Sequence, residues 1–205
     1  PFRYACLAEP LACVIHAISR VGTPLPDGVI ITGAGISAYL FAQVLIARGL
    51  SPDRILVTGR RDARLATVKQ LGAHVLDVRC GDLADAARNI FGAPAPELLI
   101  DQTGDPELLA GAMDIIARQG TLFIYDFTGH DIPFNFGTMQ LREITIKTST
   151  GCPGTMPAAI EMIATNQVDL AGAITHTFAP AQMEDAYASL ARKGPTHLKS
   201  VIEFD

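Results

Sequence analysis

The sequence predicts an α/β fold in which a doubly wound parallel sheet of six strands carries helices on both faces. Short β-branched apolar runs alternate with helical segments of about ten residues, the pattern of βαβ units with right-handed crossovers. The most apolar run, residues 29–32, passes directly into a glycine-rich turn and a helical segment. With 205 residues, 49% of them hydrophobic and 18% charged, the chain can bury a substantial core.

The expected elements follow one another along the chain. A helix is expected after Pro10, because proline fits the first helical turn, and residues 23–28 are expected to form a loop. Strands are expected at residues 29–32, 54–58, 74–77, 96–101, 120–125 and 143–148, then at 174–178 and 199–204. Helices are expected from the glycine turn to residue 48 and at residues 64–71, 82–90, 106–118, 156–166 and 181–192. The first six strands suffice for a complete dinucleotide-binding sheet.

The turn after residues 29–32 is the candidate cofactor site. Residues 33–38, Gly-Ala-Gly-Ile-Ser-Ala, follow the pattern G-x-G-x-x-G/A of the Rossmann dinucleotide-binding fold. Gly33 and Gly35 permit a tight turn, and without a Cβ they let a pyrophosphate approach the positive end of the next helix. Ala38 is small enough for close packing of helix and strand. A tight turn that binds no ligand is the alternative for this motif.

The end of the second strand indicates which nucleotide is bound. An acid about twenty residues past the glycines holds the adenosine ribose of NAD, but here Gly59 stands there, followed by Arg60 and Arg61. Glycine leaves room for the additional phosphate of NADP, and a guanidinium offers it a bidentate, permanently charged fork. The sequence therefore favours NADP over NAD, with its 2′-phosphate held mainly by Arg61 and assisted by Arg60. Alternatively, both arginines belong to a solvated helix start, and Asp62 neutralises one of them.

Charge and hydropathy argue against several other classes of protein. The net charge is −5 and the basic residues are scattered, so no nucleic-acid partner is expected. Residues 28–47 carry no charge and are long enough to suggest a membrane span. The glycine turn divides them into a buried strand and a buried helix, so no span is expected. No signal peptide is visible, and a cytoplasmic location is expected.

The cysteines and histidines show no spacing typical of a metal site. They are Cys6, Cys13, Cys80 and Cys152, and His16, His74, His130, His176 and His197. Without a C-x-x-C pair, the cysteines are expected to be reduced, buried thiols in a cytosolic compartment. The histidines are expected to stand apart, each without a second metal ligand.

The order of these motifs resembles the medium-chain dehydrogenases/reductases, the family of the zinc-type alcohol and polyol dehydrogenases. Residues 7–17 are similar to the family's passage from catalytic to cofactor domain, and residues 32–38 and 61–73 to its nucleotide motifs. Residues 101–104 resemble the end of its fourth strand, and residues 174–176 its return to the catalytic domain. The resemblance implies three parts: residues 1–16 end the catalytic domain, 17–150 form the Rossmann domain, and 151–205 return to the catalytic domain.

The resemblance also implies roles for particular residues. The backbone at Ile36 and Ser37 is expected to meet the pyrophosphate, and Thr103 and Gly104 to lie beside the nicotinamide. Glu9 is expected near zinc, as an additional ligand or through metal-bound water. Family members carry the catalytic zinc ligands in a preceding GroES-like part, which has no counterpart here. Zinc is therefore expected in the intact enzyme and not on this chain alone; the start at Pro1 hints at a longer parent.

The expected function is that of the cofactor-binding portion of a zinc-dependent, NADP-preferring alcohol or polyol dehydrogenase. Such an enzyme transfers a hydride between nicotinamide and a secondary alcohol or ketone, and this chain alone is expected to be inactive. The alternatives are a zinc-free quinone- or enoyl-type reductase, a stand-alone nucleotide-binding module and a Rossmann domain with degenerate binding. Residues 143–148 are expected to pair subunits edge to edge, in a homodimer or homotetramer. Asp126 departs from the family pattern, and its role stays open.

Overall fold

The structure is a computed structural model that describes residues 2–93, 95–127, 129, 131–192, 194 and 196–204, apart from the side chain of residue 2. Six strands form one sheet in the order β3-β2-β1-β4-β5-β6, and each neighbouring pair is parallel. They are β1 (Val29–Thr32), β2 (Ile55–Gly59), β3 (His74–Asp77), β4 (Leu98–Asp101), β5 (Thr121–Ile124) and β6 (Thr145–Thr148). The order reverses between β1 and β4, as in dinucleotide-binding sheets. The predicted α/β fold, a doubly wound Rossmann sheet of six parallel strands, is confirmed.

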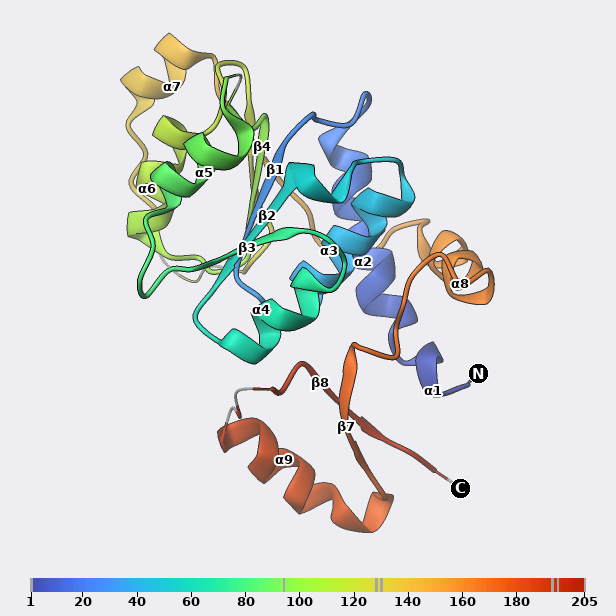
Figure 1. Ribbon diagram of the computed structural model, residues 1–205. Coiled ribbons are helices and arrows are strands. Elements are labelled where there is room, and N and C mark those ends of the chain that lie inside the picture. The colour runs from blue at the N-terminus through green and yellow to red at the C-terminus, as the bar shows by residue number, and fades with distance from the viewer. Residues whose placement is uncertain are drawn as a thin grey trace.

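Helices cover both faces of this sheet (Figure 1). On one face lie α2 (Ala8–Val21), α3 (Ile36–Ala47) and α4 (Asp62–Lys69), and on the other α5 (Leu83–Phe91) and α6 (Pro106–Ile115). Residues of β1 alternate between the two cores, because Val29 and Ile31 pack with α2 and α3, whereas Ile30 packs with α5 and α6. Since both faces are covered, every residue of β1 is buried, which explains its uninterrupted apolar sequence.

The C-terminal part adds a helix and a small second sheet. α8 (Met156–Ala164) packs against α2. β7 (Ile174–Phe178) and β8 (Lys199–Ile202) form a parallel pair linked through α9 (Met183–Arg192), below the main sheet in Figure 1. The chain's first helix, α1 (Phe2–Ala5), reaches this unit through an Arg3–Glu203 ion pair of 3.2 Å. α2 runs through the boundary predicted between residues 16 and 17, and the predicted division into parts stays a prediction.

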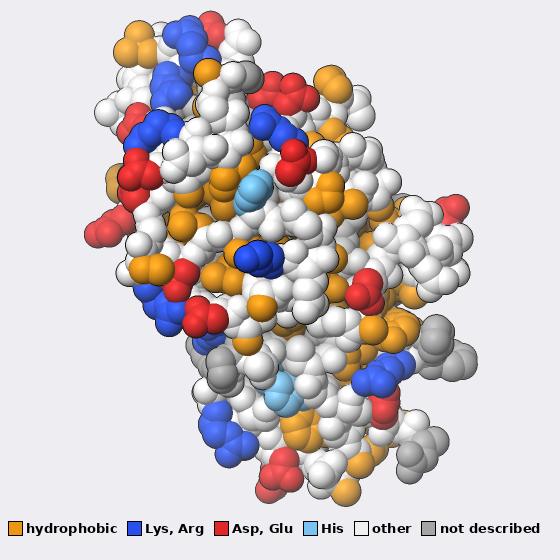
Figure 2. Space-filling view, in the orientation of Figure 1, with side chains coloured by type: hydrophobic (Ala, Val, Ile, Leu, Met, Phe, Trp, Pro, Cys, Tyr) orange, Lys and Arg blue, Asp and Glu red, His pale blue; other side chains and the backbone are white. Residues whose placement is uncertain are grey.

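The main difference from the predicted elements lies between β5 and β6. A helix that the sequence analysis did not predict, α7 (Phe136–Arg142), begins where the Asn135 side chain accepts a 3.0 Å hydrogen bond from the amide of Thr138. It ends at Glu143, whose left-handed φ of 56° delays the sixth strand to Thr145. No helix in the described part of the chain combines the length and the apolar character that a membrane crossing needs. Acidic and basic side chains are interspersed on the face seen in Figure 2.

Candidate functional site

The glycine turn lies at the carboxyl end of β1, where the order of the strands reverses. Gly33 has a φ of +88°, which favours glycine, and Gly35 precedes α3 with an extended backbone. A Cβ at Gly35 would meet no atom within 4 Å, so the backbone there borders open space. Gly35, the N-cap residue, has no side chain to cap the first turn of α3, where Ile36 and Ser37 are half-buried. Unpaired amides and the positive end of a helix are suited to a phosphate group.

Ala38 lies behind these residues, fully buried between α3 and the sheet. A larger side chain at this position would push α3 away from the sheet, and with it the amides of the turn. The structure therefore brings residues 33–38 together in the arrangement expected from their sequence.

The carboxylate of Asp101 organises the loop that faces the glycine turn. It is fully buried and accepts hydrogen bonds from the hydroxyls of Thr32 (2.6 Å) and Thr103 (2.7 Å). It also accepts from the amides of Thr103 (3.2 Å) and Gly104 (2.9 Å). A Cβ at Gly33 would lie 3.5 Å from Cγ2 of Thr103, so the loop and the turn are in contact. Asp101 belongs to the motif at residues 101–104, but no role was predicted for it. Its position as a lone acid at the end of an apolar strand is the sequence feature that indicates such a role.

Close packing explains why a glycine stands at position 59, at the end of β2. It is buried, and a Cβ there would lie 2.7 Å from the Cβ of Ala34 in the glycine turn. Both atoms are attached directly to backbone, so neither can swing aside. Glycine is thus required for the close approach of β2 to the turn, whatever nucleotide is bound.

The two arginines after Gly59 precede α4, and Arg61 is its N-cap residue. Arg60 is exposed, Arg61 is half-buried, and neither forms an ion pair with any carboxylate in the described ranges. The carboxylate of Asp62 instead pairs with Arg79 at 2.6 Å, which differs from the alternative that Asp62 neutralises a neighbouring arginine.

Arg64, which the sequence analysis did not name, adds a further cation beside these arginines. Its Nε is buried without a hydrogen-bond partner, and burial followed by the charge of Arg61 lowers its pKa. The positive charge of Arg61 therefore adds to burial in disfavouring the charged form of Arg64.

Glu9, Cys13 and Cys152 form a second cluster of polar side chains. Glu9 lies in the first turn of α2 and Cys13 one turn later, and the Cys13 thiol donates a 3.1 Å hydrogen bond to Glu9 Oε1. Cys152 comes from the loop between β6 and α8, and one donor atom from each residue lies within 4.8 Å of the others. Burial, then the hydrogen bond and negative charge of Glu9, raises the pKa of the Cys13 thiol to about 12.

The expectation that all the cysteines are buried is wrong. The cysteines are free thiols, but Cys6 and Cys80 are exposed, and Cys13 and Cys152 are half-buried. Cys6 and Cys80 lie in turns outside the core, whereas the packing of α8 on α2 brings Cys13 and Cys152 together.

Comparison with known proteins assigns the chain to a family. A sequence profile described as zinc-binding dehydrogenase matches residues 38–165. The chain belongs to the zinc-binding dehydrogenases. Sheep (Ovis aries) sorbitol dehydrogenase is 27% identical to it over 207 residues, and L-arabinitol 4-dehydrogenase of Aureobasidium melanogenum is 26% identical over 186. These alignments cover 100% and 88% of this chain but 57% and 49% of the relatives, so the chain spans about half their length.

A solved structure has the same fold as this zinc-binding dehydrogenase chain. It is that of a short chain alcohol dehydrogenase from E. coli in complex with NADH, which superposes with a TM-score of 0.89. The superposition covers 98% of this chain and 59% of the other, at 22% sequence identity. The resemblance to zinc-type alcohol and polyol dehydrogenases noted in the sequence is thereby confirmed at the level of family and fold.

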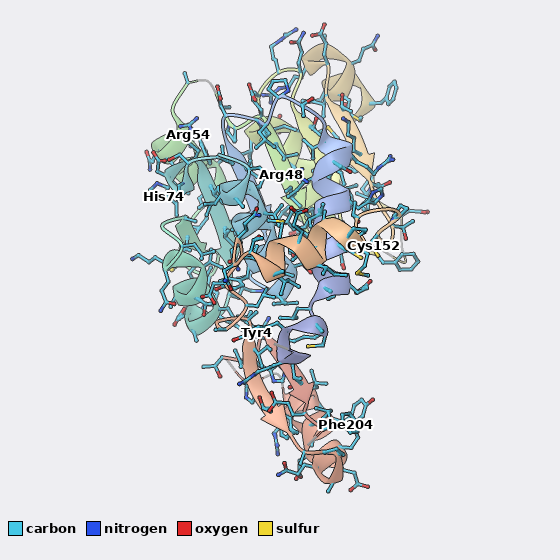
Figure 3. All side chains as sticks on the ribbon, turned by 90° about the vertical axis from the view of Figure 1, so that its right-hand side faces the viewer. Tyr4, Arg48, Arg54, His74, Cys152 and Phe204 are labelled. Atoms are coloured by element: carbon cyan, nitrogen blue, oxygen red, sulfur yellow. The ribbon has the colours of Figure 1, made fainter. Side chains whose placement is uncertain are left out.

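The donor set of the second cluster fits the metal that gives the zinc-binding dehydrogenases their name. Cysteine thiolates and carboxylate oxygens are ordinary zinc ligands, and Glu9, Cys13 and Cys152 supply both types. Figure 3 shows Cys152 where the loop before α8 reaches α2.

Tyr125 connects this cluster with the glycine turn of the zinc-binding dehydrogenase chain. Its hydroxyl interacts with Ser37, and burial, followed by the neighbouring Cys13 and Glu9, raises its pKa to about 12. Its ring meets Phe41 edge-on at 4.9 Å between centroids. The next residue, Asp126, is exposed.

Two histidines that the sequence analysis expected to stand apart lie together. The rings of His176 and His197 stack at 4.4 Å between centroids, because β7 and β8 are paired. Burial, then the charges of His176, Arg64 and Arg61, lowers the pKa of the buried His197. His130 lies outside the described residues.

Proposed function

We propose that this chain is the cofactor-binding part of an NAD(P)-dependent, zinc-type alcohol or polyol dehydrogenase. The observation that carries the proposal is the turn at Gly35. The turn borders open space, leads into the N-terminal end of α3, which the Gly35 residue cannot cap with a side chain, and lies where the strand order reverses. The names of the relatives, sorbitol and arabinitol dehydrogenases, support polyols or their ketones as the substrate class. NADH in the related E. coli structure supports a nicotinamide dinucleotide.

Different residues of the site would bind different parts of the cofactor. Gly33 and Gly35 leave room for the pyrophosphate, and the amides of Ile36 and Ser37 donate hydrogen bonds to it. Thr103 and Gly104, which hydrogen-bond to Asp101, would lie beside the nicotinamide end. These residues bind and orient the cofactor and take no part in bond breaking.

When bound, nicotinamide would accept or supply the hydride, and zinc would polarise the alcohol oxygen. Glu9 would face the zinc from α2, and the half-buried ring of Tyr125 would help to exclude water beside the cofactor. The apolar stripe of Met183, Tyr187 and Leu190 on α9 is exposed, which supports contact between residues 151–205 and a further catalytic part.

NADP is the cofactor form that the charges favour. The charge of Arg61 contributes to lowering the pKa of Arg64, neither arginine has an ion-pair partner among the described residues, and Asp62 is paired with Arg79. An additional phosphate would relieve their mutual repulsion and accept charge-assisted hydrogen bonds from them. Arg60, exposed beside them, would assist.

The edge strand β6 would pair two copies of the chain. It has a neighbour on one side only, β5, and the adjoining helix α7 exposes Phe136 and Leu141. Open backbone groups beside apolar side chains support a homodimer, or a homotetramer built from it. Sedimentation of the chain would test this part of the proposal.

The function is tested by a Gly35→Ala substitution. The added methyl group meets no protein atom and the φ of −87° suits any residue, so the melting temperature should stay unchanged. The same methyl group would stand where the pyrophosphate approaches, and NADPH affinity should fall about ten-fold or more. Because the chain has no tryptophan, binding is best followed by nicotinamide fluorescence and by the rise in melting temperature.

The matched control is Gly111→Ala, another glycine whose Cβ would meet nothing, on α6. It should leave NADPH binding intact. If the unmodified chain shows neither a fluorescence change nor a rise in melting temperature up to about 1 mM NADPH, the proposed function is wrong.

A further inference from the structure

The cluster of Glu9, Cys13 and Cys152 brings donors from distant parts of the chain to one point. Glu9 and Cys13 are four residues apart and therefore share one face of α2. Cys152 reaches the same face from the loop before α8, and one donor atom of each residue lies within 4.8 Å of the others. Neighbouring ligands of a tetrahedral zinc ion lie about 3.5 to 4 Å apart, so small side-chain rotations suffice to close the set.

Hydrogen bonds of the Thr155 side chain hold the loop of Cys152 in place. The hydroxyl of Thr155 donates to the carbonyl oxygen of Ala12 at 2.8 Å, next to Cys13 in α2, and approaches that of Cys152 at 3.2 Å. Behind it, α8 packs on α2, with Ala159 and Met162 buried. Cys13 thus lies on a helix, and Cys152 lies in a loop that hydrogen bonds tie to that helix, which favours a preorganised metal site.

The chemistry of these donors selects among metal ions. Two thiolates and a carboxylate suit zinc and other thiophilic ions, whereas magnesium and calcium prefer oxygen ligands alone. Glu9 is exposed and both thiols are half-buried, so an ion can enter from solvent.

We propose that Glu9, Cys13 and Cys152 form a zinc site that this chain provides by itself, with a fourth position open. Each thiol gives up its proton to solvent as its sulfur binds the ion, so two protons are released per zinc. The site goes beyond the proposed function, in which Glu9 only faces a zinc ion held by another part of the enzyme. It also differs from the expectation that zinc is not held by this chain alone.

The test uses Co²⁺ as a spectroscopic substitute for zinc, on the reduced chain with a non-thiol reductant. We expect one equivalent of Co²⁺ to produce a thiolate-to-cobalt charge-transfer band, and Zn²⁺ to displace it. Cys13→Ala and Cys152→Ala should each weaken binding at least about ten-fold and reduce the band. Glu9→Gln, at an exposed position, should weaken binding but keep the band, because both thiolates remain.

The matched control is Cys80→Ala, which removes an exposed thiol outside the cluster and should leave the titration unchanged. A folded, reduced chain without a charge-transfer band would overturn the proposal. So would a band that keeps its full intensity in both cluster variants, or one that Cys80→Ala abolishes, since the metal would then be bound elsewhere. NADPH binding is measured separately on the same protein, so failure of the metal site is distinguishable from failure of the proposed function.

Discussion

The carboxylate of Asp101 accepts a 2.6 Å hydrogen bond from the hydroxyl of Thr32, and both side chains are fully buried. Thr32 ends β1 and Asp101 ends β4, so this bond joins the two strands between which the sheet reverses its order. The same carboxylate fixes Thr103 and Gly104. One buried acid thereby sets the distance between the glycine turn and the loop opposite it.

Asp101→Asn should destabilise the chain by about 1–3 kcal/mol, because an amide NH₂ group would face donors that now meet a carboxylate oxygen. NADPH affinity should fall with it, since the loop at Thr103 would lose its anchor. Chemical denaturation and a cofactor titration measure the two effects. Thr32→Val, which removes one donor and leaves the other bonds of the carboxylate, should cost less; an equal cost would contradict the central role of Asp101.

Gly59→Ala should destabilise the chain by about 1–3 kcal/mol, because the new Cβ would stand 2.7 Å from that of Ala34. The comparison variant is Gly111→Ala within α6, where the methyl group meets nothing and helix propensity should stabilise by about 0.5–1 kcal/mol. Thermal unfolding of the two variants should therefore shift in opposite directions. If Gly59→Ala is as stable as the unmodified chain, close packing is not the reason for that glycine.

Arg61→Ala should weaken NADPH binding about ten-fold or more and leave NADH binding nearly unchanged, because only NADPH carries the additional phosphate. Isothermal titration with both cofactors measures the difference. Arg88→Ala on α5 removes an exposed arginine from the opposite face of the sheet and should affect neither cofactor. An equal loss for both cofactors in Arg61→Ala would contradict the NADP preference.

Tyr39 should make stability fall at alkaline pH. Burial, then the charge and hydrogen bond of Asp169, raises its pKa from 10 to about 12. Between these values the unfolded chain releases the phenol proton and the folded chain keeps it, so the contribution of Tyr39 is complete below pH 10 and is lost towards pH 12. The difference in unfolding free energy between the unmodified chain and Tyr39→Phe should therefore shrink above pH 10. A difference that stays constant across this range would contradict the shift.

Several features of the fold were predictable because they depend on local sequence. Parallel strands buried on both faces need uninterrupted apolar runs such as residues 29–32, and a strand that meets a helix at a glycine pair implies the dinucleotide-binding turn. The helix α7 was missed because it lacks buried residues, and its Asn135 cap was its only clear local signal among the described residues. The exposure of Cys6 and Cys80 was missed because the sequence does not show which side of a turn faces solvent.

The candidate site was predictable only in part. The family resemblance implied that Glu9 lies near zinc, but nothing local linked it to Cys13 or Cys152. The place of Cys152 depends on how α8 packs against α2. The proposed role of Arg64 also depends on packing, because burial and the charge of Arg61 together distinguish it from an ordinary surface arginine.

The sequence by itself determined the sheet, its glycine turn and the resemblance to zinc-type dehydrogenases, because each of these is written in short contiguous segments. Only the tertiary structure decided which distant side chains meet: Cys152 with Cys13, His176 with His197, and Gly59 with Ala34. The physical reason is that such contacts arise from the packing of helices and strands far apart in the chain, which hydrophobic periodicity drives but does not specify residue by residue.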